Sequence, residues 1–126
     1  MRIGVDLLDI PRFATVAKHT RYRTVLFTDA ELAEADGMAE PRSTERLAGR
    51  FCAKEAVAKL LGRGFGQGLR WRDIEVTNDR WGAPVVTLTG GARRIADETG
   101  VASVALSLSH QSDLVVCVAT GIPTSE

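Results

Sequence analysis

Apolar and β-branched residues form runs along the chain that are typical of strands. Residues 3–10 (IGVDLLDI) form the first run, which predicts a strand that ends before Pro11. Residues 73–89 and 101–120 each contain two runs around a polar turn, which indicates two antiparallel hairpins. We expect the turn of the second hairpin at residues 110–112.

Other segments have the spacing of apolar and polar residues that is typical of helices. A short helix is expected over residues 12–20, and Thr28 or Asp29 can cap a second one. Residues 37–44 are expected to form a loop, and residues 91–99 another short helix.

The longest helical segment is expected to begin at Ser43 or Thr44 and to run to about Leu61, before the glycine-rich sequence RGFGQG. It is apolar around most of its circumference, as helices in a protein core are. Helices and hairpins in this order predict an α+β fold, with an antiparallel sheet of hairpins packed against a long central helix and shorter helices. We assign residues 1–122 to a single domain and residues 123–126 to a short polar tail.

Composition adds a constraint on partners. Sixteen basic and sixteen acidic residues give a formal net charge of zero, so no global field favours nucleic acid or an anionic membrane. The cations gather in residues 12–23 and 42–63, which allows a local basic surface. Cys52 and Cys117 lie in apolar runs and are expected to be buried free thiols. Without a signal peptide or a transmembrane run, the expected compartment is the cytoplasm.

Two carboxylates stand inside apolar elements, Asp6 in the first strand and Glu55 in the long helix. A buried anion is costly unless it is paired or bound to a metal. Asp6 can simply cap a strand end, and Glu55 can pair with Lys59 four residues later. Taken together, however, the two carboxylates suit Mg²⁺, which one or two carboxylates hold alongside waters and substrate phosphates.

A basic stripe repeats at four-residue steps along the long helix. It consists of Arg42, Arg46, Arg50 and Lys54. Like charges at this spacing repel one another, so the stripe is either a solvated face relieved by neighbouring glutamates or a binding site for phosphate. The loop GRGFGQG at residues 62–68 follows a helix, which differs from a P-loop, but its pliable backbone can pack close to a nucleotide.

Two hydrolase-like patterns are weaker. Ser109 and His110 are adjacent in a strand and therefore face opposite sides, which argues against a triad with Asp113. Cys52 has cationic neighbours but no other feature of a nucleophile, so core packing is the better interpretation.

Four segments stand out when the chain is taken as a whole: GVDLLDIPRF near the N-terminus, GRFCAKEAVAKLLGRGF in the middle, the NDRWGAP turn and LSLSH near the C-terminus. With these segments in this order, the chain resembles the holo-[acyl-carrier-protein] synthases, the small single-domain class of 4′-phosphopantetheinyl transferases. It implies the family's fold and a reaction in which coenzyme A donates 4′-phosphopantetheine to a serine of an apo acyl carrier protein. It also implies Mg²⁺ and a homotrimer that binds coenzyme A between protomers.

The resemblance also implies roles for single residues. Asp6 and Glu55 resemble the magnesium carboxylates, and Lys59 the cation on the pyrophosphate, so these three are the expected catalytic residues. Arg12 resembles the carrier-protein contact. Together with the basic stripe and the glycine loop described above, the resemblance gives six expected coenzyme A contacts: Arg50, Lys54, Lys59, Gly62, Gly64 and His110.

Two other functions fit part of the pattern. One is a non-catalytic module of the same fold that binds coenzyme A or a nucleotide, although such a module need not keep both carboxylates and Lys59. The other is a transferase dedicated to the carrier domains of polyketide or peptide synthases.

The chain has Asp9 where the family usually has Glu, so Asp9 is not assigned to the site.

Overall fold

The computed structural model describes residues 1–125; the last residue of the expected tail, Glu126, lies outside the described residues. The elements in chain order are β1 (Ile3–Asp9), α1 (Ile10–Ala17), α2 (Thr20–Leu26), α3 (Asp29–Asp36), α4 (Arg42–Leu61), the 3₁₀ helix η1 (Trp71–Asp73), β2 (Ile74–Asn78), β3 (Pro84–Leu88), α5 (Gly90–Glu98), β4 (Val101–Gln111) and β5 (Leu114–Pro123).

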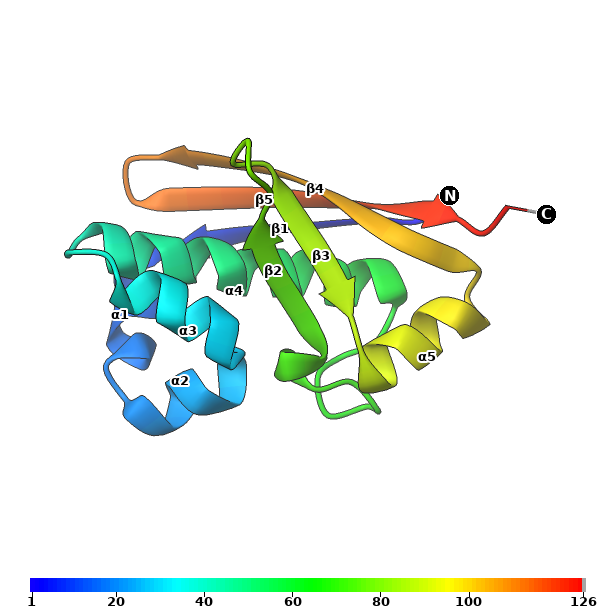
Figure 1. The fold of residues 1–126 in the computed structure, drawn as a ribbon, viewed down its shortest axis with the longest axis horizontal. Helices are drawn as coiled ribbons and strands as arrows, with labels where there is room; N and C mark the ends of the chain where they lie inside the picture. Colours follow the sequence, from blue (N-terminus) through cyan, green and yellow to red (C-terminus); the bar gives the residue numbers. More distant parts are fainter. Residues whose placement is uncertain (126) are drawn as a thin grey trace.

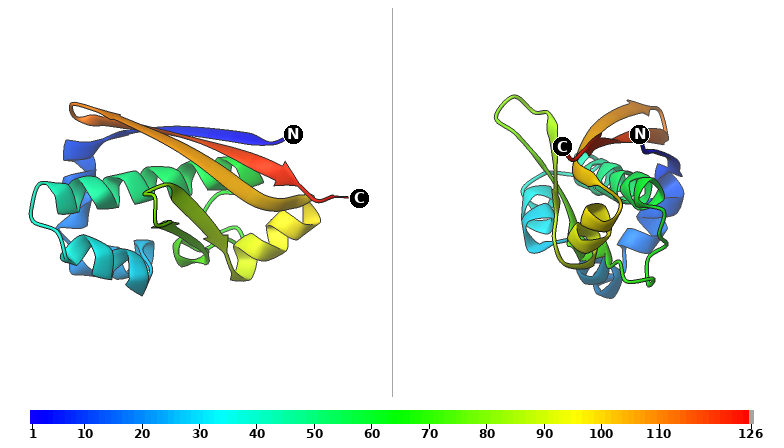
Figure 2. Two further views of the ribbon diagram at one scale, coloured as in Figure 1. Left: turned by 45° about the horizontal axis from the view of Figure 1, so that its top comes forward. Right: turned by 90° about the vertical axis from the view of Figure 1, so that its right-hand side faces the viewer.

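Helix α4 is the centre of the molecule (Figure 1). Strands β1, β5 and β4 form an antiparallel sheet in that spatial order, and this sheet covers one side of α4 along its length. The β2–β3 hairpin and α5 lie against another side, and helices α1 and α3 pack on the N-terminal half of α4, with α2 beside α1 and η1 (Figure 2). This arrangement confirms the expected α+β fold.

The sheet sits close to α4 because the contact surface is built from small residues. A Cβ atom added to Gly4 would stand 2.0 Å from the carbonyl oxygen of Ala56, so only glycine permits this approach of β1 to the helix. Cys52, Ala53 and Ala56 on the helix are fully buried, as is Cys117 on β5. The close packing brings the side chains of β1 within reach of the polar residues of α4.

Three local predictions were wrong. Helix α4 begins at Arg42 after Pro41, and its first turn is capped by Glu40, whose carboxylate accepts hydrogen bonds from the amide (2.8 Å) and hydroxyl of Thr44. Helix α2 was not expected as a separate helix, because its sequence TRYRTVL carries no clear apolar stripe. The turn of the last hairpin is at residues 112–113, so His110 lies within β4, opposite Val115.

Other local predictions are confirmed. Both hairpins form, and Thr28 caps α3 through a reciprocal pair of hydrogen bonds with Glu31. Strand β5 continues to Pro123, one residue into the expected tail. Within residues 1–125 there is no helix that combines the length and apolar character needed to cross a membrane.

The two faces of the sheet differ sharply. Gly4, Asp6 and Leu8 alternate toward α4, whereas Ile3, Val5 and Leu7 point away from it and are 68%, 53% and 64% exposed. The valines of β5 opposite these residues continue the outward face, with Val116 opposite Leu7. The chain therefore exposes a contiguous apolar surface on the side of the sheet that α4 does not cover.

Candidate functional site

The first cluster of functional side chains lies where β1 passes over the C-terminal half of α4. Asp6 is on the face of β1 directed at the helix, and its side chain is 14% exposed. Lys59 reaches it from α4: its Nζ is 2.9 Å from Asp6 Oδ1 and 3.1 Å from the carbonyl oxygen of Val5. This hydrogen bond with Asp6 is the main cause that raises the pKa of Lys59.

Glu55 lies one helical turn before Lys59 and is half-buried. Burial raises the pKa of Glu55 above its usual value, and the charge of Asp6 raises it further, while Lys59 acts in the opposite direction. The cluster of Asp6, Glu55 and Lys59 therefore holds two carboxylates for one ammonium group, in a place where the negative charge of Glu55 is poorly hydrated.

This donor set fits a hard divalent cation. Mg²⁺ typically takes one or two protein carboxylates and completes its octahedron with waters and substrate phosphates. A cation would also remove the unfavourable effect of Asp6 on Glu55. Among residues 1–125 no three His, Cys, Asp or Glu side chains are grouped to hold a metal, so a cation here would need ligands from water or substrate.

The two cysteines lie beneath this cluster and are buried and free. The thiol of Cys52 is 3.4 Å from the carbonyl oxygen of Asp6. Burial raises the pKa of Cys52 to about 12 and that of Cys117 to about 11. Both thiols therefore stay protonated at neutral pH, which agrees with core packing and disfavours Cys52 as a nucleophile.

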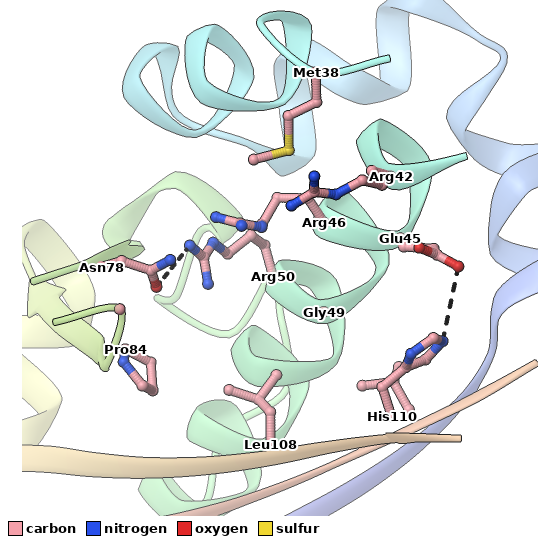
Figure 3. A pocket seen from close by; sticks show the side chains of 12 residues that line it. Met38, Arg42, Glu45, Arg46, Gly49, Arg50, Asn78, Pro84, Leu108 and His110 are labelled. Atoms are coloured by element: carbon pink, nitrogen blue, oxygen red, sulfur yellow. Dashed lines mark hydrogen bonds and ion pairs between the residues drawn. The ribbon is translucent and has the colours of Figure 1, made fainter. Parts of the chain in front are cut away.

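The second cluster lines a cavity of about 390 Å³ on the other side of α4. Figure 3 shows Arg42, Arg46 and Arg50 following one another along the helix, with Asn78 at one end of the cavity and His110 at the other. Met38, Pro84 and Leu108 supply apolar wall. A cavity with several guanidinium groups and an apolar wall suits an anionic ligand that also carries a flat apolar part.

Arg50 is the most deeply buried cation of this cavity, at 4% exposure. Its Nη2 donates to Glu34 Oε1 at 3.1 Å and to Asn78 Oδ1 at 3.0 Å. Burial lowers the pKa of Arg50, and Glu34 is the main opposing influence. His110 is half-exposed, with its Nε2 3.9 Å from Glu45.

Lys54 does not share the surface of the other three stripe residues. Its side chain is completely buried, and its Nζ is 2.8 Å from Glu31 Oε1 and 3.1 Å from the carbonyl oxygen of Trp71. A third bond goes to the carbonyl oxygen of Ile74. Lys54 thus ties α4 to α3 and to the start of β2, and it does not line the cavity expected for the nucleotide.

The glycine loop begins at the same end of α4 as Lys59. Gly62 ends the helix with φ of +76°, the left-handed conformation that glycine adopts without strain. The amide of Gly64 donates to Gln67 Oε1 at 2.8 Å. The structure therefore brings Gly62 close to Lys59 along the chain, and places both Gly62 and Gly64 away from the cavity that Arg50 and His110 line.

Arg12 lies on α1, beyond the end of β1. It lines a groove of about 460 Å³ together with Leu8, Phe13 and Phe51. Asp9 belongs to the same groove, and its carboxylate caps α1 by accepting from the Arg12 amide at 3.1 Å. The cap gives Asp9 a structural role, while the Arg12 guanidinium remains available to a partner.

The two clusters lie at opposite edges of one sheet. Asp6 is on the edge strand β1 and His110 on the edge strand β4, with β5 between them. Their partners on β5 are Cys117 and Val115, two residues apart, so both side chains are on the face that α4 covers. Ser109 is opposite Val116 on the other face, which rules out a catalytic pair with His110.

Sequence reasoning missed Glu34, Asn78 and Met38. Asn78 comes to the cavity from β2 and Met38 from the segment after α3. Their contacts with α4 are long-range in sequence, and no local motif marks them. Only the turn sequence NDRWGAP, which contains Asn78 and Pro84, pointed to this part of the site.

Comparison of the sequence with known proteins points to one family. A family profile described as the 4′-phosphopantetheinyl transferase superfamily matches residues 2–119. The chain is 44% identical over 126 residues to the holo-[acyl-carrier-protein] synthase of Desulforudis audaxviator, covering 98% of this chain and 94% of that protein. It is 41% identical over 111 residues to the enzyme of the same name from Moorella thermoacetica, covering 87% and 84%.

Solved structures show the same fold. A Plasmodium yoelii acyl carrier protein synthase with ADP bound superposes with a TM-score of 0.87 at 30% identity, covering 98% of this chain and 96% of that one. A Bacillus anthracis holo-(acyl-carrier-protein) synthase in complex with coenzyme A (3′,5′-ADP) gives 0.82 at 31% identity, with the same coverage of 98% and 96%. The chain belongs to the 4′-phosphopantetheinyl transferase superfamily.

Proposed function

We propose that this chain transfers 4′-phosphopantetheine from coenzyme A to a serine of an apo acyl carrier protein. The observation that carries the proposal is the cluster of Asp6, Glu55 and Lys59. Relatives named holo-[acyl-carrier-protein] synthase, some with coenzyme A or a nucleotide bound in their solved structures, support the assignment.

In this reaction the serine oxygen forms a bond to the β-phosphorus of coenzyme A, and the serine proton passes to a base, either Glu55 or a water molecule. The bond from that phosphorus to the bridging oxygen breaks, which releases adenosine 3′,5′-bisphosphate. Phosphoryl transfer depends mainly on positioning and on stabilising charge on the phosphate oxygens. Lys59, more than half exposed beside Asp6, would contact the pyrophosphate.

Asp6 and Glu55 would hold Mg²⁺, whose chemistry here is to polarise the phosphate and to stabilise the leaving group. The fit rests on the two carboxylates and on the raised pKa of Glu55. The protein itself supplies the positioning of these groups. Asp6 orients Lys59, and the close packing at Gly4 fixes β1 against α4.

We further infer that one site is built from two copies of the chain, in a homotrimer. The cations at the β4 edge and the reaction cluster at the β1 edge are separated by β5 in one protomer. A second copy that brings its β4 edge to the first copy's β1 edge would unite them around one coenzyme A. The exposed apolar face formed by Ile3, Val5 and Leu7 supplies a surface for this association.

The carrier protein would approach the groove that contains Arg12. This groove starts at Leu7, the residue after Asp6 on β1, and includes Phe51, one helical turn before Glu55. An acidic partner is favoured there because Arg12 is exposed and its guanidinium has no hydrogen bond within the described residues.

The test is direct. The protein is incubated with coenzyme A, Mg²⁺ and an apo acyl carrier protein, and the carrier is weighed by mass spectrometry. Addition of the phosphopantetheine mass, together with release of adenosine 3′,5′-bisphosphate, supports the proposal. Binding of coenzyme A without any mass change on fatty-acid, polyketide or peptide carriers would instead favour the non-catalytic module.

A further inference from the structure

The cavity at the β4 edge has a carboxylate behind its cations. Glu34 on α3 accepts two hydrogen bonds at the same oxygen, Oε1: one from Arg46 Nη1 at 2.8 Å and one from Arg50 Nη2 at 3.1 Å. Glu34 itself is not among the residues that line the cavity. Its carboxylate, on a side chain that is 34% exposed, therefore contacts the two guanidinium groups from outside the cavity lining and leaves the position of a ligand anion open.

Arg50 depends on this support. It is 4% exposed, and within residues 1–125 its buried Nε has no hydrogen-bond partner. Besides Glu34, Asn78 is the other acceptor for its Nη2. A buried cation needs a counter-charge, and Glu34 supplies it to Arg50, whereas the side chain of Asn78 is neutral.

Arg46 and Arg50 would otherwise repel each other. They are one helical turn apart, and Arg46 is one of the influences that lower the pKa of Arg50. The shared carboxylate oxygen of Glu34 offsets this repulsion and fixes the spacing of the two guanidinium groups. Without it, Arg46, whose side chain is 25% exposed, is free to turn into solvent.

We propose that Glu34 is a positioning residue that holds Arg46 and Arg50 from behind so that they converge on a phosphate group of the ligand. The proposal rests on the proposed function and deepens it, because the cavity would then take the 3′-phosphate of coenzyme A. Glu34 would set the preference of the enzyme for coenzyme A over dephospho-coenzyme A, which lacks that phosphate.

Coulomb attraction alone predicts the opposite effect of removing this carboxylate. Replacing Glu34 with a neutral residue makes the cavity more positive, which should tighten the binding of any anion. If position matters more than net charge, the same change weakens binding of the 3′-phosphate. The sign of the effect therefore separates the two accounts.

The experiment compares wild-type enzyme with Glu34→Gln, and measures KM and kcat with coenzyme A and with dephospho-coenzyme A. We expect the KM for coenzyme A to rise about tenfold, because the neutral amide of Gln holds the two guanidinium groups less firmly than a carboxylate does, with kcat nearly unchanged. The KM for dephospho-coenzyme A should stay within about twofold of wild type, since the other contacts persist.

Asp36→Asn is the matched control. Asp36 is on the same helix and pairs with Arg23 at 2.6 Å, away from the cavity, so this variant removes an ion pair and one charge without touching Arg46 or Arg50. Both KM values should remain at the wild-type level. Any loss of folded protein in Glu34→Gln is recorded by thermal unfolding and does not alter the ratio of the two KM values.

Two further outcomes would overturn the inference. A lower KM for coenzyme A in Glu34→Gln would favour simple Coulomb attraction, and an equal rise of both KM values would indicate a general structural role. Arg46→Ala separates this failure from a failure of the proposed function, because it removes one of the two guanidinium groups itself. If Arg46→Ala reduces the preference for coenzyme A while Glu34→Gln does not, the phosphate pocket stands and the role of Glu34 is refuted.

Discussion

The two edges of the main sheet carry opposite kinds of chemistry. At the β1 edge Asp6, Glu55 and Lys59 combine two carboxylates with one cation. At the β4 edge the guanidinium groups of α4 and the imidazole of His110 face a cavity, with Glu34 and Glu45 as counter-charges. The first suits a metal and a reacting pyrophosphate, and the second suits a fixed anion.

The difference supports the proposal that each edge supplies only part of a site for coenzyme A. A ligand with phosphates at two places needs both kinds of surface, and β5 keeps them apart within one chain. The apolar outer face of the sheet offers the means to unite them, because burying it against other copies would bring unlike edges together.

The largest expected effect comes from the joining surface. Val116→Asp places a charge opposite Leu7 on the outer face, where association would strip it of water. We expect dissociation of the oligomer and nearly complete loss of transfer, measured by light scattering and by carrier modification. Val85→Asp, on an exposed position of β3, is the control and should change neither. An active Val116→Asp monomer would contradict the shared site.

Changes at the β1 edge should come next. Asp6→Asn and Glu55→Gln should keep the fold and lower kcat about a hundredfold or more, because each removes a carboxylate for the cation. The steady-state rate in the presence of Mg²⁺ measures this loss. Asp97→Asn, which removes an exposed carboxylate paired with Arg93, should have full activity. Unchanged activity of both site variants with a chelator present would refute the metal assignment.

Lys54 and Lys59 of α4 are expected to differ in role, the first in stability and the second in transfer. Lys54→Met leaves Glu31 buried without its partner and should lower the free energy of unfolding by about 3–5 kcal/mol. Lys59→Met removes an exposed partner of Asp6 and should cost less than about 1 kcal/mol, while transfer falls. Urea unfolding and kinetics check the pair. If Lys54→Met is as stable as wild type but binds coenzyme A more weakly, Lys54 contacts the ligand and its structural role is refuted.

The smallest expected effect concerns Glu55 without metal. Burial and the charge of Asp6 raise its pKa in the folded protein above the ordinary value of 4.5, so the folded state favours the protonated form. That stabilisation is complete below the ordinary pKa and is lost as pH rises through the raised one. In a chelator, Glu55→Gln should therefore melt higher than wild type at pH 7, with the difference shrinking toward pH 4.5. A wild type that melts higher at pH 7 would contradict this sign.

Local pattern marked the residues that the structure brings together at the β1 edge. Glu55 and Lys59 are four residues apart on a helix, and an aspartate in an apolar strand is unusual enough to mark Asp6. The same patterns predicted both hairpins and the central helix. These features depend on residues near in sequence, where helix and strand periods apply.

The β4 edge shows where sequence reasoning fails. Steps of four residues advance about 40° beyond a full helical turn, so three steps rotate the stripe by about 120°. Arg42 therefore faces the cavity while Lys54 faces the core, and the apparent stripe is not one surface. Glu34 and Asn78 reach Arg50 through tertiary contacts that no spacing rule predicts.

Subunit complementation tests the central claim most directly. Asp6→Asn disables the β1 edge, and the double variant Arg42→Ala/His110→Ala disables the β4 edge; each alone should be nearly inactive at low coenzyme A. If each site joins the β1 edge of one copy to the β4 edge of another, random mixing in equal amounts should restore about a quarter of wild-type activity. Mixtures that remain as inactive as the separate variants, although light scattering shows exchanged oligomers, would contradict the shared site.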